Sequence, residues 1–152
     1  MHVIVATDGS RQSLAAAKYF RSFADPEAIT MISVVAVIRP YASVAFADDL
    51  APRDRATAES GSFRGAAESA TKAVAAAFDG WGPKVQTRVR SGSPANEIIK
   101  AAKQAEAGLV VVAAGSRGLS DTVLLGSTAQ RVQHSAPCPV LVVRPPARKP
   151  RR

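Results

Sequence analysis

Three short segments of this chain combine glycine with side-chain oxygen atoms, and each could help to hold an anion. They are Asp8-Gly9-Ser10, Gly115-Ser116-Arg117-Gly118 and Gly126-Ser127-Thr128. Glycine lets a ligand approach backbone N–H groups closely, and N–H groups at the start of a helix attract negative charge. Each segment alone is also typical of a turn, a tight loop or a helix cap. Their combination predicts an anionic ligand, and phosphate is the usual one.

The other reactive side chains predict no catalytic centre. The histidines, His2 and His134, belong to no Ser-His-Asp order and to no pair with metal-ligand spacing. Cys138 is the only cysteine, which excludes an intrachain disulfide and a cysteine-based zinc site. No general base can be named within reach of a phosphate. We therefore expect a binding protein without catalytic residues, in which any hydrolysis of a bound phosphate ester would be slow.

The segments that must position the anion-binding residues alternate between strand and helix patterns. Five runs are typical of strands: residues 3–7, 29–35, 84–90, 109–113 and 139–143. Longer stretches of helical period separate them, and this alternation predicts an α/β fold with an open parallel sheet. Ligands of such sheets bind outside the carboxyl ends of the strands. Asp8 and Gly115 each follow the end of a predicted strand.

Two of the strands have contrasting patterns. Residues 84–90 alternate between polar and apolar side chains, which predicts a half-exposed strand at an edge of the sheet. Residues 109–113 are apolar at every position, which predicts a strand in the centre of the sheet with helices covering both faces.

Four helices are expected between these strands. Ser10 would cap the first, whose apolar face would contain Ala16, Ala17, Phe20, Phe23 and Ala24. The second would span residues 56–78, and Ser93-Pro94 would open the third. The fourth would begin near Gly126, where Ser127 and Gln130 have the spacing of a capping box. Residues 39–54 are predicted to form a mobile loop.

The whole chain is consistent with one domain, residues 1–144, followed by a basic tail, residues 145–152. Its 152 residues carry a net charge of +8, but the last eight positions hold Arg148, Lys149, Arg151 and Arg152, and without these four the excess falls by half. We interpret the tail as a solvated, disordered end, with contact to nucleic acid or an acidic partner as the alternative. No apolar run approaches the ~20 residues of a membrane span, and the N-terminus has no secretory signal pattern, so we expect a cytoplasmic protein.

The chain resembles the universal stress protein family over residues 3–143. The resemblance rests on four motifs in the family's order: VIVATDGSRQS, SGSPANEIIKAA, GLVVVAAGSRGLS and GSTAQRVQHSAPCPVLVVR. It implies a Rossmann-like, adenine nucleotide alpha hydrolase-like fold, with five parallel strands in the order 3-2-1-4-5. It also implies a homodimer formed through Val140–Val143, and a regulatory protein of the stress response that binds ATP, ADP or AMP, with Mg²⁺ beside a triphosphate.

The resemblance also implies a role for each matching residue. Asp8 would bind the ribose hydroxyls, Val34 would offer backbone groups to the adenine edge, and Ala6 and Thr7 would line the base and sugar pocket. Gly115, Arg117 and Gly118 would contact the ribose and the phosphates, and Gly126, Ser127 and Thr128 would hold the phosphates.

One departure from the family pattern bears on the phosphates. ATP-binding members have nine residues before the last glycine of this motif, whereas seven separate Gly118 from Gly126 here. A tighter loop can keep the backbone cradle while changing the space for a triphosphate. Two alternatives to nucleotide regulation therefore stay open: a dimeric interaction module that binds no nucleotide, and an adenylating enzyme of a related class.

Overall fold

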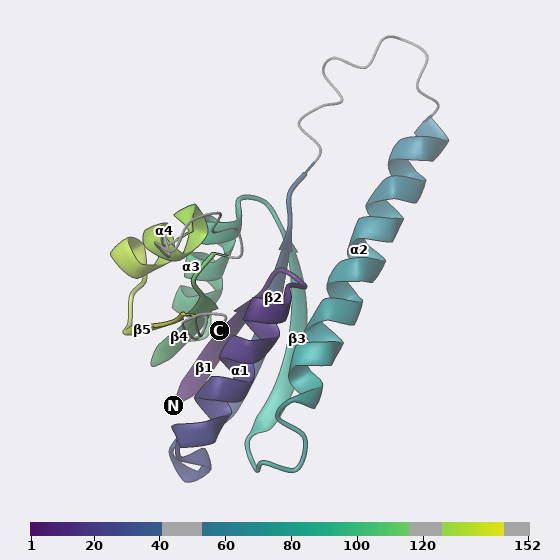
Figure 1. The fold of residues 1–152 in the computed structure, drawn as a ribbon. Coiled ribbons are helices and arrows are strands. Elements are labelled where there is room, and N and C mark those ends of the chain that lie inside the picture. Colours follow the sequence, from purple (N-terminus) through teal and green to yellow (C-terminus); the bar gives the residue numbers. More distant parts are fainter. Residues whose placement is uncertain (41–52, 116–125, 145–152) are drawn as a thin grey trace, which may run out of the picture.

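The computed structural model describes residues 1–40, 53–115 and 126–144 of the chain. Its five strands form one parallel sheet in the order β3-β2-β1-β4-β5. The strands are β1 (His2–Thr7), β2 (Met31–Ile38), β3 (Lys84–Ser91), β4 (Leu109–Ala113) and β5 (Val140–Val143). Figure 1 shows the chain rising from the N-terminus through β1, with the carboxyl ends of β1, β2 and β3 towards the top of the view. The predicted fold and strand order are confirmed.

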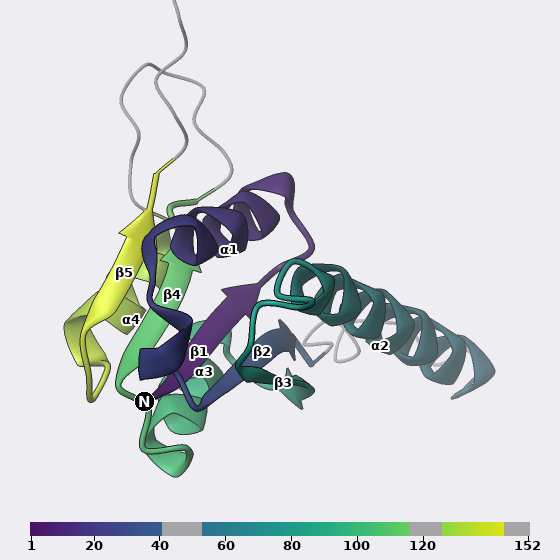
Figure 2. The same cartoon turned by 90° about the horizontal axis from the view of Figure 1, so that it is seen from below.

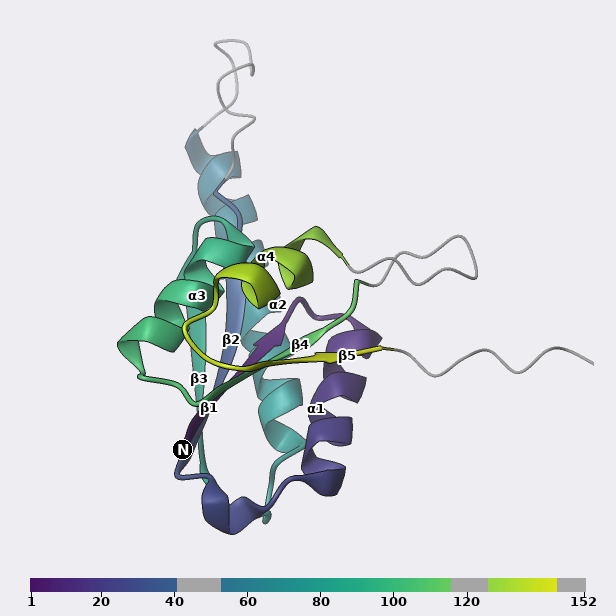
Figure 3. The same ribbon diagram turned by 90° about the vertical axis from the view of Figure 1, so that its left-hand side faces the viewer.

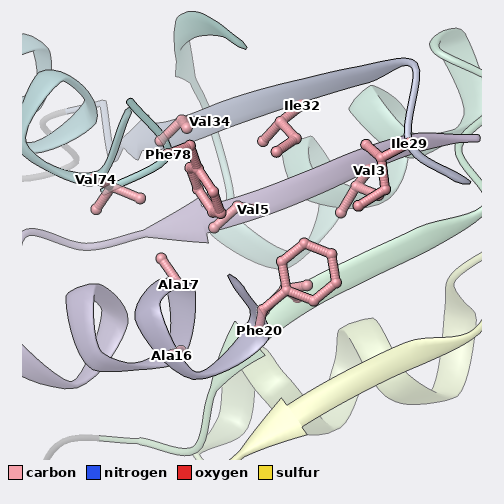
Figure 4. Close-up of a cluster of buried hydrophobic side chains, with 11 residues drawn as sticks. Val3, Val5, Ala16, Ala17, Phe20, Ile29, Ile32, Val34, Val74 and Phe78 are labelled. Atoms are coloured by element: carbon pink, nitrogen blue, oxygen red, sulfur yellow. The ribbon is translucent and has the colours of Figure 1, made fainter. Parts of the chain in front are cut away.

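Two helices cover one face of the sheet, α1 (Arg11–Phe23) over β1 and β4 and α2 (Arg53–Ala76) over β2 and β3. Figure 2 shows both on the same side of the strands, with part of α2 projecting beyond the sheet. Beneath them, Phe20 of α1 and Phe78 lie against Val5 and Ile32 of the central strands, as Figure 4 shows. These buried aromatic and β-branched side chains fix the separation between helix and sheet, because protein cores are close-packed.

The other face is covered by α3 (Pro94–Gln104) and α4 (Ser127–Ser135), which pack on each other and on the sheet. Figure 3 shows them together on the side of the sheet opposite α1. Ile98 of α3 and Val132 of α4 are buried with Ile4 and Val110 in a second apolar cluster. Both faces of β1 and β4 are therefore apolar, as expected of strands between two helical layers.

The positions of the strands test two further predictions. β3 is an edge strand, as the alternation of its side chains predicted. β4 was expected at the centre of the sheet, but β1 holds that place and β4 lies between β1 and β5. The second strand from an edge is covered by helices on both faces, as the central strand is. An all-apolar sequence therefore cannot distinguish these two places in the sheet. Among the described residues, no helix is both long and apolar enough to span a membrane.

The second strand was predicted two residues too early at its start and three residues too early at its end. Pro26–Ala28 form a short 3-10 helix, η1, and Ile29 donates its N–H to the Pro26 carbonyl, so Ile29 is a buried turn residue outside the strand. At its other end, β2 continues to Ile38, which pairs with Ser91 of β3. Pairing with β3 therefore extends β2 beyond the predicted boundary.

Two helical details were also wrong. Phe23 was placed on the buried face of α1, but it is 58% exposed and contacts the exposed Tyr19 ring edge-on. The predicted capping box at Ser127 and Gln130 does not form, because Gly126 is the N-cap and Ser127 is already the first helical residue. Ser10 does cap α1, and its hydroxyl accepts a hydrogen bond from Ser13 N at 3.2 Å.

Candidate functional site

A cavity of about 420 Å³ opens at the carboxyl ends of β1, β2 and β4. The chain runs outward from β1 to β2 and β3 on one side and through β4 to β5 on the other, so the cavity lies where the strand order reverses. Ligands of open parallel sheets bind at this point. Its walls come from the ends of these strands and from the first turns of α1, α3 and α4.

The turn between β1 and α1 forms one wall of the cavity. Gly9 has a φ of +80°, which side-chain-bearing residues rarely adopt, and this lets the chain leave β1 and enter α1 within three residues. Asp8 Oδ1 accepts a hydrogen bond from Ser10 N at 2.9 Å. Its other carboxylate oxygen makes no hydrogen bond with the described residues. Asp8 is thus held by one oxygen and can accept hydrogen bonds from a ligand with the other.

A buried pair of hydroxyl groups supports this turn. Thr7 Oγ1 and Ser13 Oγ lie 2.7 Å apart, and Thr7 Oγ1 also accepts a hydrogen bond from Gly9 N at 3.1 Å. Ser13 Oγ donates to the Ser10 carbonyl at 2.9 Å. These bonds tie the end of β1 to the first turn of α1, so the position of Asp8 is fixed by the backbone around it.

The opposite wall is formed by Gly115, after β4, and by the start of α4. A Cβ atom placed on Gly115 would lie 2.9 Å from Gly126 Cα, so the two segments approach as closely as they do only because both residues are glycine. Gly126 has no side chain to cap α4, and the first turn of a helix contains N–H groups without intrahelical partners. Ser127 and Thr128 add hydroxyl groups there. This wall can donate several hydrogen bonds to an anion.

A third wall is apolar. It is formed by Val35 and Val37 of β2 and by Pro94 and Ile98 of α3. The pairing of β1 with β2 ends at Thr7 and Ala36, whereas Val37 still pairs with Arg90 of β3. The wall therefore offers apolar surface for a planar group beside the end of the β1–β2 ladder.

Most of the predicted site residues meet in this cavity. Those that line it are Ala6, Thr7, Asp8, Gly115, Gly126, Ser127 and Thr128. Arg117 and Gly118 lie outside the described residues, and so do residues 41–52 of the predicted mobile loop. Sequence reasoning missed Val37 and Arg39, which line the cavity at the end of β2.

The expected place of Val34 is wrong. This residue was placed near the end of the second strand, but it lies in the middle of β2, where it pairs with Val5 and is fully buried beneath α1 and α2. Because the strand ends three residues later than predicted, Val37 occupies the position expected for Val34. The extended apolar run up to Ile38 was the signal that could have located it.

The charges of the site are few. Asp8 and Arg39 are the charged side chains among the described residues that line the cavity. Within the same part of the chain, no group of three or more His, Cys, Asp or Glu side chains could hold a metal ion. Cys138 lies away from the cavity, and burial raises the pKa of its thiol, which disfavours the reactive thiolate. The described lining of the cavity therefore carries groups that could bind a ligand, and no catalytic constellation is recognisable among the described residues.

The comparisons with known proteins agree with this fold. The model of the universal stress protein family matches residues 1–144. A universal stress protein of Methanocaldococcus jannaschii is 31% identical over 148 residues, which span 97% of this chain and 84% of that protein.

Two solved structures share the fold. A universal stress protein in complex with cAMP has a TM-score of 0.63 at 24% identity, covering 95% of this chain and 96% of that one. A universal stress protein family protein from Arabidopsis thaliana with AMP bound has a TM-score of 0.69 at 17% identity, covering 97% and 93% of the two chains.

Proposed function

Because this chain belongs to the universal stress protein family, we propose that it is a regulatory protein that binds an adenine nucleotide in the cavity at the carboxyl ends of β1, β2 and β4. Two structural neighbours carry the adenine nucleotides cAMP and AMP. Regulation of a stress response through the occupied or empty cavity is the function that we infer from this membership.

The observation that carries the proposal is the arrangement of three different walls around one cavity. A carboxylate directly follows the central strand, an apolar wall lies on the β2 side, and a glycine pair with a helix start lies on the β4 side. A nucleotide presents the matching groups in the same order: an apolar base, a ribose with hydroxyl groups and an anionic phosphate. Each wall thus faces the part of the nucleotide that it can bind.

Each residue has a role in this proposal. Asp8 accepts hydrogen bonds from the ribose hydroxyls, and the backbone of Val37 takes over the contact with the adenine edge that was expected of Val34. Ala6 and Thr7 line the pocket for base and sugar. Gly115, Gly126, Ser127 and Thr128 donate hydrogen bonds to phosphate. Arg117 and Gly118 complete the phosphate contacts in the family motif.

The number of phosphates is the open part of the ligand's identity. Seven residues separate Gly118 from Gly126 where ATP-binding relatives have nine, which favours a shorter phosphate chain. If ATP binds, Mg²⁺ would be held mainly by the phosphate oxygens, since the described residues contain no cluster of metal-binding side chains. Any hydrolysis would be slow, because the carboxylate in the described lining, Asp8, is assigned here to the ribose and not to the phosphates.

The proposal includes a homodimer through β5. This strand is at an edge of the sheet, and all four of its residues, Val140–Val143, are apolar and partly exposed. An uncovered apolar edge strand favours pairing with another chain, and a second copy would cover it symmetrically. A cytoplasmic location and a tail without nucleic acid contacts are part of the same proposal.

Isothermal titration calorimetry tests nucleotide binding. AMP, ADP and ATP with Mg²⁺ are titrated into full-length protein freed of bound nucleotide, and into Gly126→Val, whose side chain would enter the contact with Gly115. Micromolar binding that is lost in the variant supports the proposal. If no nucleotide produces heat with the natural chain, nucleotide binding is excluded under these conditions, and the dimeric interaction module becomes the better interpretation.

A further inference from the structure

Arg39 stands at the mouth of the nucleotide cavity, one residue after the end of β2. Val35, Val37 and Arg39 follow one another at the two-residue spacing of a strand, and all three line the cavity. Val35 is buried, Val37 is partly exposed and Arg39 is exposed, so this row runs from the floor of the cavity to its opening. The guanidinium group is therefore available where a ligand enters.

Arg39 also borders a second cavity of about 920 Å³, between the end of β2 and α2. The two cavities share Thr7, Asp8, Val37 and Arg39 as lining residues. Arg39 thus lies on the ridge between them. It makes no ion pair with any acidic residue that the structure describes, since the ion pairs there involve other arginines and lysines.

The order of the strands places Arg39 at the base end of a bound nucleotide. β1 with Asp8 lies between β2 with Arg39 and β4 with Gly115, and adjacent strands are ~4.8 Å apart. If the ribose lies at Asp8 and the phosphates lie at Gly115 and Gly126, the base lies on the opposite side of the ribose, against Val37. The charged group nearest to that base is then the guanidinium of Arg39, on the side of the ribose away from the phosphate wall.

A guanidinium group is planar, weakly hydrated and attracted to the face of an aromatic ring. The geometry points to Arg39 as a specificity-determining residue that lies over the face of the bound base at the mouth of the cavity. This inference rests on the proposed nucleotide function and adds the residue that favours a purine over a pyrimidine. The larger ring system of a purine reaches further from Val37 towards the opening.

Calorimetry with AMP, adenosine and CMP on full-length protein tests the inference. Arg39→Ala should lower the affinities for AMP and for adenosine by the same factor, about fivefold. The reason is that a stacking contact acts on the base, which both ligands carry. The preference for AMP over CMP should fall in the same variant. Arg88→Ala removes an equal charge from β3, outside the cavity lining, and should leave all three affinities unchanged.

Two results would overturn the inference while leaving the proposed function intact. If Arg39→Ala lowered the affinity for AMP but not for adenosine, Arg39 would contact the phosphate and not the base. If the variant bound AMP as tightly as the natural chain, Arg39 would make no contact with the ligand. If the natural chain bound neither AMP nor adenosine, this inference and the proposed function would both fail. Because Arg39 is exposed, its replacement should not alter the melting temperature, which circular dichroism verifies.

Discussion

Gly115 and Gly126 approach each other so closely that a Cβ atom built on either one would lie 2.9 Å from the Cα atom of the other. The contact joins the end of β4 to the start of α4 within the cavity wall proposed to bind phosphate. Gly126 has φ −58° and ψ 150°, which any residue can adopt, so its need for glycine comes from the contact and not from its own conformation.

This contact predicts a non-additive pair of substitutions. Gly115→Ala and Gly126→Ala should each lower the free energy of unfolding by about 1–3 kcal/mol, the usual cost of overpacking. The double variant should cost less than the sum, because the first methyl group already separates the two segments. Urea denaturation of the four proteins measures this.

A matched control is Gly65→Ala in α2, where an added Cβ atom meets nothing within 4 Å. Alanine should stabilise this helix position by about 1 kcal/mol. Strictly additive losses at Gly115 and Gly126 would show that the two glycines act independently and that the contact does not matter.

The second prediction concerns the ribose. Asp8→Ala should weaken AMP binding about tenfold or more, since hydrogen bonds to a charged group are stronger than neutral ones. The natural chain should also bind 2′-deoxy-AMP more weakly than AMP, and this difference should disappear in Asp8→Ala. Calorimetry with both ligands forms a cycle that isolates the ribose contact. Asp79→Ala removes an exposed carboxylate outside the cavity lining and controls for the lost charge. If Asp8→Ala still bound 2′-deoxy-AMP more weakly than AMP, the proposed role of Asp8 would be contradicted.

The fold was predictable from the sequence because each layer leaves its own pattern. The alternation of Lys84, Arg88 and Arg90 with apolar residues identified an edge strand, and the apolar run of β4 identified an interior one. Strand ends were harder to predict, because an apolar residue such as Ile29 is buried equally well in a turn as in a strand. Backbone hydrogen bonds set the start of β2, and the residue types alone could not locate it.

The same error moved one site residue to the wrong face. Val34 and Val37 are three positions apart, and side chains an odd number of positions apart in a strand point to opposite faces of the sheet. Val34 therefore lies in the core beneath α1 and α2, while Val37 lines the cavity. Gly115, Gly126, Ser127 and Thr128 do lie together at the cavity, because their residue types, and not a strand boundary, were the basis of that prediction.

The third prediction concerns the proposed dimer. The Pro139 carbonyl accepts a hydrogen bond from Val110 N of β4, and the Val143 carbonyl accepts one from Ala114 N, directly after β4. By alternation, the backbone groups of Val142 point away from β4 towards the open edge. Val142→Pro should thus remove an N–H group needed for pairing with a second copy while leaving the β4–β5 ladder intact. We expect a dimer mass for the natural chain and a monomer mass for the variant in light scattering at micromolar concentration.

The other edge of the sheet provides the control for this experiment. Gly92, which directly follows β3, donates its N–H to the Ile38 carbonyl of β2, so the N–H group of Val89 in β3 points outward by alternation. Val89→Pro should leave the mass unchanged. A natural chain that is already monomeric, or a loss of the dimer with Val89→Pro as well, would contradict dimerisation through β5.

The fourth prediction concerns the ion pair that joins β3 to α3, the helix that supplies Pro94 and Ile98 to the cavity. Arg90 Nε lies 2.9 Å from Glu97 Oε2, and Arg90 also donates to Gln104 Oε1 at 2.9 Å. The hydrogen bond from Arg90, aided by Lys100, lowers the pKa of Glu97 below its ordinary value of 4.5. The unfolded chain therefore binds this proton more readily than the folded chain.

It follows that the stabilisation from Glu97 is present above about pH 4.5 and is lost as the pH falls below that value. Glu97→Gln should be less stable than the natural chain at pH 7, and the difference should shrink between pH 4.5 and the lower pKa of the folded state. Urea denaturation across this range measures the difference, with Glu68→Gln, from an exposed pair with Arg64, as the control for one lost surface charge. A difference that stayed constant with pH would mean that Glu97 stabilises the α3 wall of the cavity by packing alone.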